Sequence, residues 1–182
     1  SSNFAIYSPN GGSIEVSGGT VSGDGVPAIS NYSKPITITI KDGAVVTSTM
    51  VHTSMGTIYV NEVGSVLNVL GGTVENTADS GNVIYNREAT VNISGGTVSA
   101  SGSGMVVNST SGSVVNISGG TVSAVNGCTI YNVSDDSAVN ISGGIVSATN
   151  GCAIYNRGIG KIVISDDATV TSANSNTEFT DN

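Results

Sequence analysis

The chain has 182 residues, of which 25 are glycine and none is tryptophan, and its formal net charge is −8. Charged residues make up only 10% of it, and five Lys and Arg stand against 13 Asp and Glu, which argues against nucleic-acid binding through a basic face. Strong helix formers are scarce and no apolar run reaches the length of a membrane helix, so we expect neither an α-rich domain nor membrane insertion.

A repeated decapeptide organises the chain. Val-Asn-Ile-Ser-Gly-Gly-Thr-Val-Ser-Ala occupies 91–100 and 115–124, and it returns at 139–148 with Ile in place of Thr. Weaker copies lie at 14–22 and 67–75, and copies with a different turn lie at 41–48 and 165–172. Such self-similarity is the signature of a repeat architecture. The valine after the turn recurs in steps of 25, 28, 24, 24, 24 and 24 residues, at Val21, Val46, Val74, Val98, Val122, Val146 and Val170.

A second motif, Ile-Tyr-Asn, lies between these valines at 84–86, 130–132 and 154–156. Each repeat therefore has three short segments of alternating apolar and polar residues, separated by turn-forming residues, and this alternation is the period of a β-strand. With its variants, the motif predicts a column of seven inward apolar residues: Ile6, Ile29, Ile58, Ile84, Val106, Ile130 and Ile154.

We predict an all-β fold, a single-stranded parallel β-helix (β-solenoid) that is right-handed, with about seven coils of about 24 residues and three short strands per coil. Three strands in so few residues leave no room for hairpins with their own core, and neither propeller blades of ~40 residues nor a leucine-rich consensus is present. Residues 1–182 form one β-solenoid domain in this prediction. We expect it to be a segment of a longer repeat protein, because neither end shows an obvious cap.

Alternation also assigns the faces of the coil. Val91, Ile93 and Val98 point inward, and the Gly-Gly pairs suit corners that need positive φ or close approach. A buried amide needs hydrogen-bond partners, which identical residues on neighbouring coils can provide. We therefore expect an inward amide ladder formed by Asn31, Asn86, Asn108, Asn132 and Asn156.

Five of the six tyrosines occupy one outward position of the repeat, where Ser30 and Val107 are the exceptions. Exposed aromatic rings can bind sugars through their apolar faces and their hydroxyls, although the rings could instead stack on one another and protect the sheet. The candidate ligand-binding residues are Tyr7, Tyr59, Tyr85, Tyr131 and Tyr155.

A second outward surface carries small β-branched and hydroxyl side chains beside the valine column. This flat lattice resembles the Thr-x-Thr faces of ice-binding solenoids, but Val45, Glu75 and Ile145 interrupt it, and such residues suit any half-exposed strand. Its members are Thr20, Ser22, Thr73, Thr97, Ser99, Thr121, Ser123, Ser147, Thr169 and Thr171.

Cys128 and Cys152 are 24 residues apart, so we expect them to stack inward on adjacent coils, either as free thiols or as a disulfide. Carboxylate pairs at two corners, Asp135-Asp136 and Asp166-Asp167, are weak candidates for Ca²⁺, and turn formation with solubility is the alternative. No other metal or cofactor is indicated.

Catalytic signatures are weak. The chain has one histidine, His52, and no carboxylates recur at column spacing, so we expect no enzymatic activity, with a polysaccharide lyase or hydrolase as the alternative. Any grafted site would lie in the longest departures from the repeat, around 49–57 and 76–82.

The strings Ile-Ser-Gly-Gly-Thr-Val-Ser-Ala, Ala-Ile-Tyr-Asn and Asp-Gly-Ala-x-Val-Thr-Ser resemble the repeats of secreted and cell-wall-attached β-helix proteins of Gram-positive bacteria. That resemblance covers nearly the whole chain and implies an extracellular or cell-wall location. Related proteins include adhesin-like stalks and a class that binds acidic plant polysaccharide with Ca²⁺; phage fibres are another possible source of such repeats. The function we expect is a non-catalytic, adhesin-like surface module whose partner is a polysaccharide, a host or cell-surface glycan, or a protein.

Overall fold

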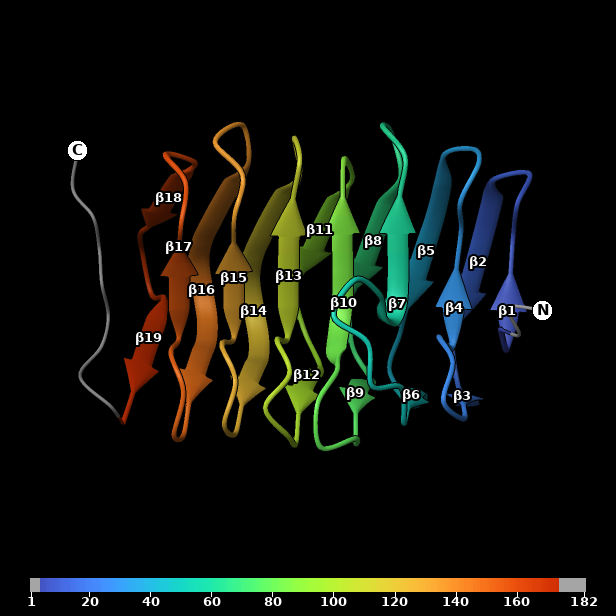
Figure 1. Ribbon diagram of the computed structural model, residues 1–182, viewed down its shortest axis with the longest axis horizontal. Coiled ribbons are helices and arrows are strands. Elements are labelled where there is room, and N and C mark those ends of the chain that lie inside the picture. Colours follow the sequence, from blue (N-terminus) through green and yellow to red (C-terminus); the bar gives the residue numbers. More distant parts are fainter. Residues whose placement is uncertain (1–3, 174–182) are drawn as a thin grey trace.

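The structure is a computed structural model that describes residues 4–173. Within this range the chain forms nineteen strands and no helix, and it winds as a solenoid of seven coils (Figure 1). In Figure 1 the front strands run upward, the rear strands run downward and the coils advance from right to left, which is a right-handed path. The predicted parallel β-solenoid is confirmed.

Each coil contributes one strand to a seven-stranded parallel sheet, whose outer surface we call the tyrosine face. Its strands, in spatial order, are β1 (Ile6–Tyr7), β4 (Ile29–Ser30), β7 (Gly56–Asn61), β10 (Asn82–Arg87), β13 (Val107–Thr110), β15 (Ile130–Asn132) and β17 (Ile154–Asn156).

The rest of each coil forms two further columns of parallel strands. One column holds β2 (Gly12–Val16), β5 (Ile36–Ile40), β8 (Val66–Val69), β11 (Thr90–Ile93) and β18 (Lys161–Ile164), and the other holds β3 (Gly19–Gly23), β6 (Ala44–Ser48), β9 (Thr73–Asn76), β12 (Thr97–Ala100) and β19 (Thr169–Ser172). Two long strands, β14 (Val114–Ala124) and β16 (Ala138–Ala148), pass through the Gly-Gly corner and belong to both columns.

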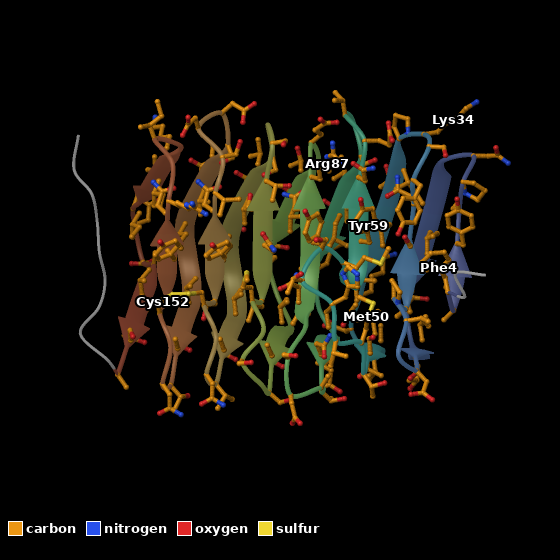
Figure 2. All side chains as sticks on the ribbon, viewed as in Figure 1. Phe4, Lys34, Met50, Tyr59, Arg87 and Cys152 are labelled. Carbon is orange, nitrogen blue, oxygen red and sulfur yellow. A yellow bond between two sulfur atoms is a disulfide. The ribbon has the colours of Figure 1, made fainter. Side chains whose placement is uncertain are left out.

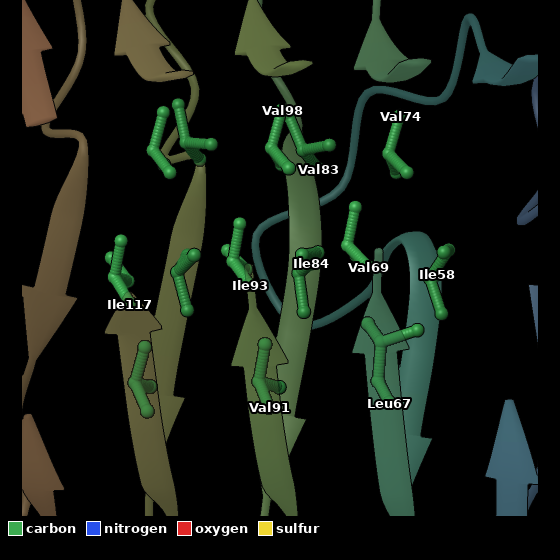
Figure 3. Close-up of a cluster of buried hydrophobic side chains, with 14 of the residues drawn as sticks. Ile58, Leu67, Val69, Val74, Val83, Ile84, Val91, Ile93, Val98 and Ile117 are labelled. Carbon is green, nitrogen blue, oxygen red and sulfur yellow. The ribbon is translucent and has the colours of Figure 1, made fainter. Parts of the chain in front are cut away.

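Stacked aliphatic side chains fill the interior, as the alternation predicts. Ile84, Val91, Ile93 and Val98 from one coil are fully buried, and their counterparts on neighbouring coils lie against them (Figure 3). The valine column pairs in register from Val21 to Val170. Residues of the first and last described coils, such as Ile6 and Ile162, are only partly buried, because a described coil covers them on one side alone.

The predicted register is wrong in one coil. Ile84 pairs with Val107, which pairs with Ile130, so Val107 and not Val106 occupies the apolar column. Both valines are fully buried, so their apolar character does not distinguish them. The turn before β13 is one residue longer than the turns before β15 and β17, counted from the preceding valine of the column. Asn108 therefore aligns with the tyrosines, and Ser109 aligns with Asn86 and Asn132.

The Gly-Gly corners behave as predicted. The second glycine of each pair has positive φ, between 71° and 76°, at Gly19, Gly72, Gly96, Gly120 and Gly144. In the inner coils this corner also stacks tightly: a Cβ on Gly96 would lie 2.5–2.8 Å from main-chain atoms of Gly71 and Gly72. The glycines are needed both for their backbone conformation and for the close approach of successive coils.

Gly96 and Gly19 allow these two requirements to be separated. Both have nearly the same φ, 73° and 71°, but a Cβ on Gly19 would meet nothing within 4 Å. We predict that Gly19→Ala lowers the free energy of unfolding by about 1 kcal/mol through backbone strain alone. Gly96→Ala should cost at least twice as much, because the coils must also move apart. Urea unfolding of both variants provides the measurement, and equal losses would show that coil spacing plays no part.

Candidate functional site: the tyrosine face

All seven described aromatic residues lie on the tyrosine face and are linked by ring contacts into two groups. Five of them are the tyrosines predicted from the repeat. The other two, Phe4 and Tyr32, lie outside the repeat position. Figure 2 shows Phe4 and Tyr59 on this side of the solenoid.

Tyr32 fills the place that Ser30 leaves in the row of rings. Ser30 pairs with Tyr7 on one side and Tyr59 on the other, so a small residue separates two tyrosines. The Tyr32 ring stacks on Tyr59 with centroids 4.7 Å apart and contacts Tyr7 at 6.0 Å. A motif search cannot find Tyr32 because it lies two residues after the repeat position. Its closeness in sequence to Ser30, the residue that replaces a tyrosine, could have indicated that it joins the row of rings.

The rings form two separate stacks. The first runs from Phe4 and Tyr7 through Tyr32 and Tyr59 to Tyr85, and its last pair has centroids 5.4 Å apart with planes at 13°. The second is Tyr131 on Tyr155, 5.1 Å apart with planes at 7°. In both of these pairs each ring uses much of one face to contact its neighbour, whereas Tyr32 meets Phe4 and Tyr7 at tilted angles of 50° and 59°.

Asn108 separates the two stacks. It pairs with Tyr85 on one side and Tyr131 on the other. Its predicted place in the inward asparagine column is therefore wrong, because the shifted register turns it to the outer surface of the sheet. Its side chain is nevertheless only 5% exposed, and its Nδ2 donates to the carbonyl of Thr53 at 3.4 Å.

Exposure varies strongly along the row of tyrosines. Tyr7 and Tyr155 are 45% and 36% exposed, Tyr85 and Tyr131 are intermediate, and Tyr59 is buried at 6%. Burial raises the pKa of the Tyr59 hydroxyl, the adjacent Tyr32 and Tyr85 add to the rise, and Arg87 acts against it. The expectation of an exposed aromatic row therefore fails at Tyr59, whose ring lies between those of Tyr32 and Tyr85.

The long insert between β6 and β7 lies on this face and crosses in front of β10 (Figure 1). The carbonyl of Thr53 accepts hydrogen bonds from the side-chain amides of Asn82 and Asn108, which belong to the next two coils. The Asn82 amide also donates to the carbonyl of Met55 at 3.0 Å. These bonds hold the insert across three coils.

Two pockets border the insert on an otherwise flat sheet. On one side of it is a pocket of about 380 Å³ lined by Val51, His52, Thr53, Ser80, Gly81, Asn82, Ser103, Gly104 and Met105. On the other side is a smaller, more apolar pocket of about 220 Å³ lined by Phe4, Gly25, Val26, Pro27, Met50, Val51, His52 and Met55. Both departures from the repeat that the sequence singled out, around 49–57 and 76–82, contribute to the larger pocket.

The predicted inward ladder is formed in one place. Asn132 donates to Asn156 at 2.8 Å, whereas Asn31 and Asn86 donate to main-chain carbonyls such as Asn61 and Val114. A regular amide ladder does exist, but on the outer surface of the column of strands that contains β8 and β11. There each amide donates to the asparagine of the preceding coil at 2.9 Å. Its members are Asn68, Asn92, Asn116 and Asn140.

The threonine and serine face has the predicted registers and is at least partly exposed throughout. Its two rows run in register from Thr20 to Thr169 and from Ser22 to Thr171. Ser99, Ser123 and Ser147 are half-buried, and Ile145, which replaces a threonine, is 45% exposed. Thr73 and Thr121 are half-buried, while Thr97 is exposed.

Cys128 and Cys152 form a disulfide between adjacent coils, with Cα atoms 4.6 Å apart. Figure 2 shows this bond at Cys152. The sequence did not decide between free thiols and a disulfide, and the expected inward, buried position is wrong, because both cysteines are half-buried. They precede β15 and β17 by two residues, at the edge where the chain enters the sheet.

The four candidate calcium ligands do not converge. Asp135 accepts from the backbone N–H of Ile159 at 2.9 Å, and Asp136 accepts from that of Gly112 at 2.8 Å and from the Ser134 hydroxyl. Asp166, at a different corner with Asp167, accepts from Ser165 at 3.2 Å. Within residues 4–173 no group of three or more His, Cys, Asp or Glu side chains could hold a metal ion. Through these hydrogen bonds, Asp135 and Asp136 connect their own turn to the turns of the neighbouring coils.

No family model, curated protein or solved structure matches this chain. The part of the chain that the structure covers has no helix long and apolar enough to cross a membrane. The fold defines the chain as a parallel β-solenoid, and its function must be argued from its surface.

The disulfide closes a loop that is one coil long, and the length of this loop determines how much the bond is expected to stabilise the fold. We predict that replacing both Cys128 and Cys152 with serine lowers the free energy of unfolding by about 3.5 kcal/mol, the loop-closure value for this length. Urea unfolding measures the loss, and reduction of the wild type should reproduce it. An unchanged midpoint under reducing conditions would contradict the assignment of this bond as a stabilising cross-link.

Asp136 should make stability depend on pH in the acidic range. Hydrogen bonds from Ser134 and the Gly112 backbone hold the pKa of this carboxyl below its ordinary value of 3.8. A carboxyl with a lowered folded-state pKa contributes stability above its unfolded value and loses it as the pH falls through the folded value. We predict that Asp136→Asn lowers the melting temperature at pH 7 and that the difference from wild type shrinks below about pH 4. A difference independent of pH would exclude this role.

Proposed function

We propose that this chain is a non-catalytic, extracellular surface module that binds glycans with its tyrosine face. The observation that carries the proposal is the segregation of the aromatic residues: all seven in the described range lie on one of the three faces of the solenoid. Stacking for stability alone would not require one face, because any of the three strand columns can carry stacked rings.

The chemistry of this face suits sugars. Tyrosine rings offer apolar surface to the C–H groups of a pyranose and a hydroxyl to its polar groups. The pocket beside the insert adds exposed hydroxyl groups from Thr53, Ser80 and Ser103. A concave site with a few polar groups beside apolar surface is typical of small-ligand binding.

Charge favours a neutral glycan. With a net charge of −8, the protein repels an acidic polysaccharide at long range, and its carboxylates do not form a described metal cluster that could bridge the two. The inter-coil disulfide supports an oxidising, extracellular location, because such bonds rarely persist in the cytosol.

The test is binding to immobilised polysaccharides. We predict that the wild type is retained by at least one neutral polymer among cellulose, xylan and mannan, more strongly than by polygalacturonate. Tyr85→Ala combined with Tyr131→Ala should abolish this retention, because the two rings supply the apolar contact.

The matched control changes the same coils on another face. Thr97→Ala combined with Ser147→Ala removes outward side chains of the threonine and serine face and should leave binding unchanged. Circular dichroism establishes that both double variants are folded. Absence of binding to neutral and acidic polymers, mucin and peptidoglycan would refute glycan binding.

A further inference from the structure

We infer that the insert between β6 and β7 binds one soft monovalent cation, Cu⁺, through the thioethers of Met50 and Met55 and the imidazole of His52. This site goes beyond the proposed function and is independent of glycan binding. The supporting observations are the pocket that the three side chains share, the apolar lining of that pocket, and the pairing of both cysteines in a disulfide.

The methionine and histidine side chains of the protein gather at the insert. The sequence has three methionines and one histidine. Met50, His52 and Met55 line the apolar pocket of about 220 Å³, and Met105 lines the larger pocket together with His52. None of the three methionines belongs to the aliphatic core, so the filling of gaps between core side chains does not account for their positions.

The apolar pocket presents its three ligands at different depths. Met50 is 4% exposed, Met55 is half-buried and His52 is exposed, so Met50 closes the inner side of the pocket and His52 lies at its mouth. Apolar surroundings keep water from a bound metal and favour its less charged oxidation state. The rest of the lining is apolar and includes no Lys or Arg; it consists of Phe4, Gly25, Val26, Pro27 and Val51.

Hydrogen bonds hold both methionines in place. The carbonyl of Met50 accepts from the side-chain amide of Asn76 at 3.0 Å, and that of Met55 accepts from Asn82 at 3.0 Å. The Tyr32 hydroxyl donates to the sulfur of Met55 at 3.7 Å, which leaves the second lone pair of this sulfur for a cation. Ligands that are held in this way lose little freedom when a cation binds.

The donor set selects the cation. Thioethers are soft ligands that favour Cu⁺, and imidazole also binds copper. Ca²⁺ and Mg²⁺ prefer oxygen ligands, and Zn²⁺ sites use thiolates, imidazoles and carboxylates. The only two cysteines of the sequence, Cys128 and Cys152, form the disulfide, so no thiol competes for a soft cation. Two thioethers and one imidazole therefore suit Cu⁺ and its closed-shell analogue Ag⁺.

Cation binding must change the hydrogen bonding of His52. In the free protein its Nδ1 accepts from the backbone N–H of Ser54 at 3.0 Å, so the proton of the neutral ring lies on Nε2. A cation at Nδ1 replaces this N–H, and a cation at Nε2 forces the ring proton onto Nδ1, where it opposes the same N–H. Either mode breaks the bond to Ser54, whose amide signal therefore reports binding.

The test is an NMR titration of the 182-residue protein, labelled with ¹³C at the methionine methyl groups, with Ag⁺, which is stable in air. We expect the methyl signals of Met50 and Met55 and the amide signal of Ser54 to shift until one equivalent of Ag⁺ is bound. The methyl signal of Met105 should move least, because this residue lines the other pocket. Cu⁺, kept reduced with ascorbate under nitrogen, should bind with the same stoichiometry in competition with bicinchoninate.

Three variants separate the ligands from their neighbours. Met55→Leu removes a sulfur and nearly conserves volume, so the fold should be kept. We expect Met55→Leu and His52→Asn each to weaken Cu⁺ binding by about tenfold or more, since even the residues that support metal ligands contribute this much. Met105→Leu makes the same change in the other pocket and should bind Cu⁺ as the wild type does.

Equal shifts of all three methionine methyl signals would overturn the inference, and so would equal losses of affinity in Met55→Leu and Met105→Leu. Shifts of the same signals by Ca²⁺ or Zn²⁺ at equal concentration would also contradict a soft site. Should Met55→Leu not fold, the methyl shifts of the wild type and the affinity of His52→Asn decide. These outcomes leave the proposed glycan binding untouched, because none of them involves Tyr85 or Tyr131.

Discussion

The in-register hydrogen bonds between successive parallel coils determine where every side chain of this protein lies. Because each strand pairs with the equivalent strand of the next coil, one repeat position becomes one column along the solenoid. The apolar core, the outward Asn92 ladder and the rows of threonine and tyrosine all follow from this pairing. Glycine at corners such as Gly96 allows it, since any Cβ there would push neighbouring coils apart.

This constraint also explains why so few charges are present. Identical residues on adjacent coils lie about 4.8 Å apart, so a repeated charge would repel itself along the whole rod. Amides avoid this problem because they both donate and accept, as Asn116 does between Asn92 and Asn140. The carboxylates at Asp135 and Asp136 lie at a corner, where backbone N–H groups of neighbouring turns satisfy them.

Much of the fold could be predicted because period and alternation are visible in one sequence. The errors arose where turns change length or side chains reach outside their column. One extra residue before β13 moved Asn108 from the core side to the tyrosine face, and two adjacent valines concealed the shift. Tyr32 replaced a missing ring from a position that alternation does not describe, and the cysteines joined outside the core.

A regular solenoid gives every coil the same surface, so a specific site requires an interruption of the repeat. Here the long insert, the missing tyrosine at Asn108 and the pocket lined by Asn82 and Ser103 lie together on one face. Each of these departures, taken alone, could be explained as ordinary variation between repeats. Their convergence on the face that carries the aromatic residues is the basis for assigning function to it.

The central claim is that the tyrosine face binds a neutral glycan. Its most direct test is an NMR titration of the wild-type protein, with assigned tyrosine ring and asparagine side-chain signals, against a neutral hexaose that it binds. We predict that the largest shift changes fall on the rings of Tyr85 and Tyr131. Changes centred on the threonine and serine face, or spread equally over all tyrosines, would contradict it.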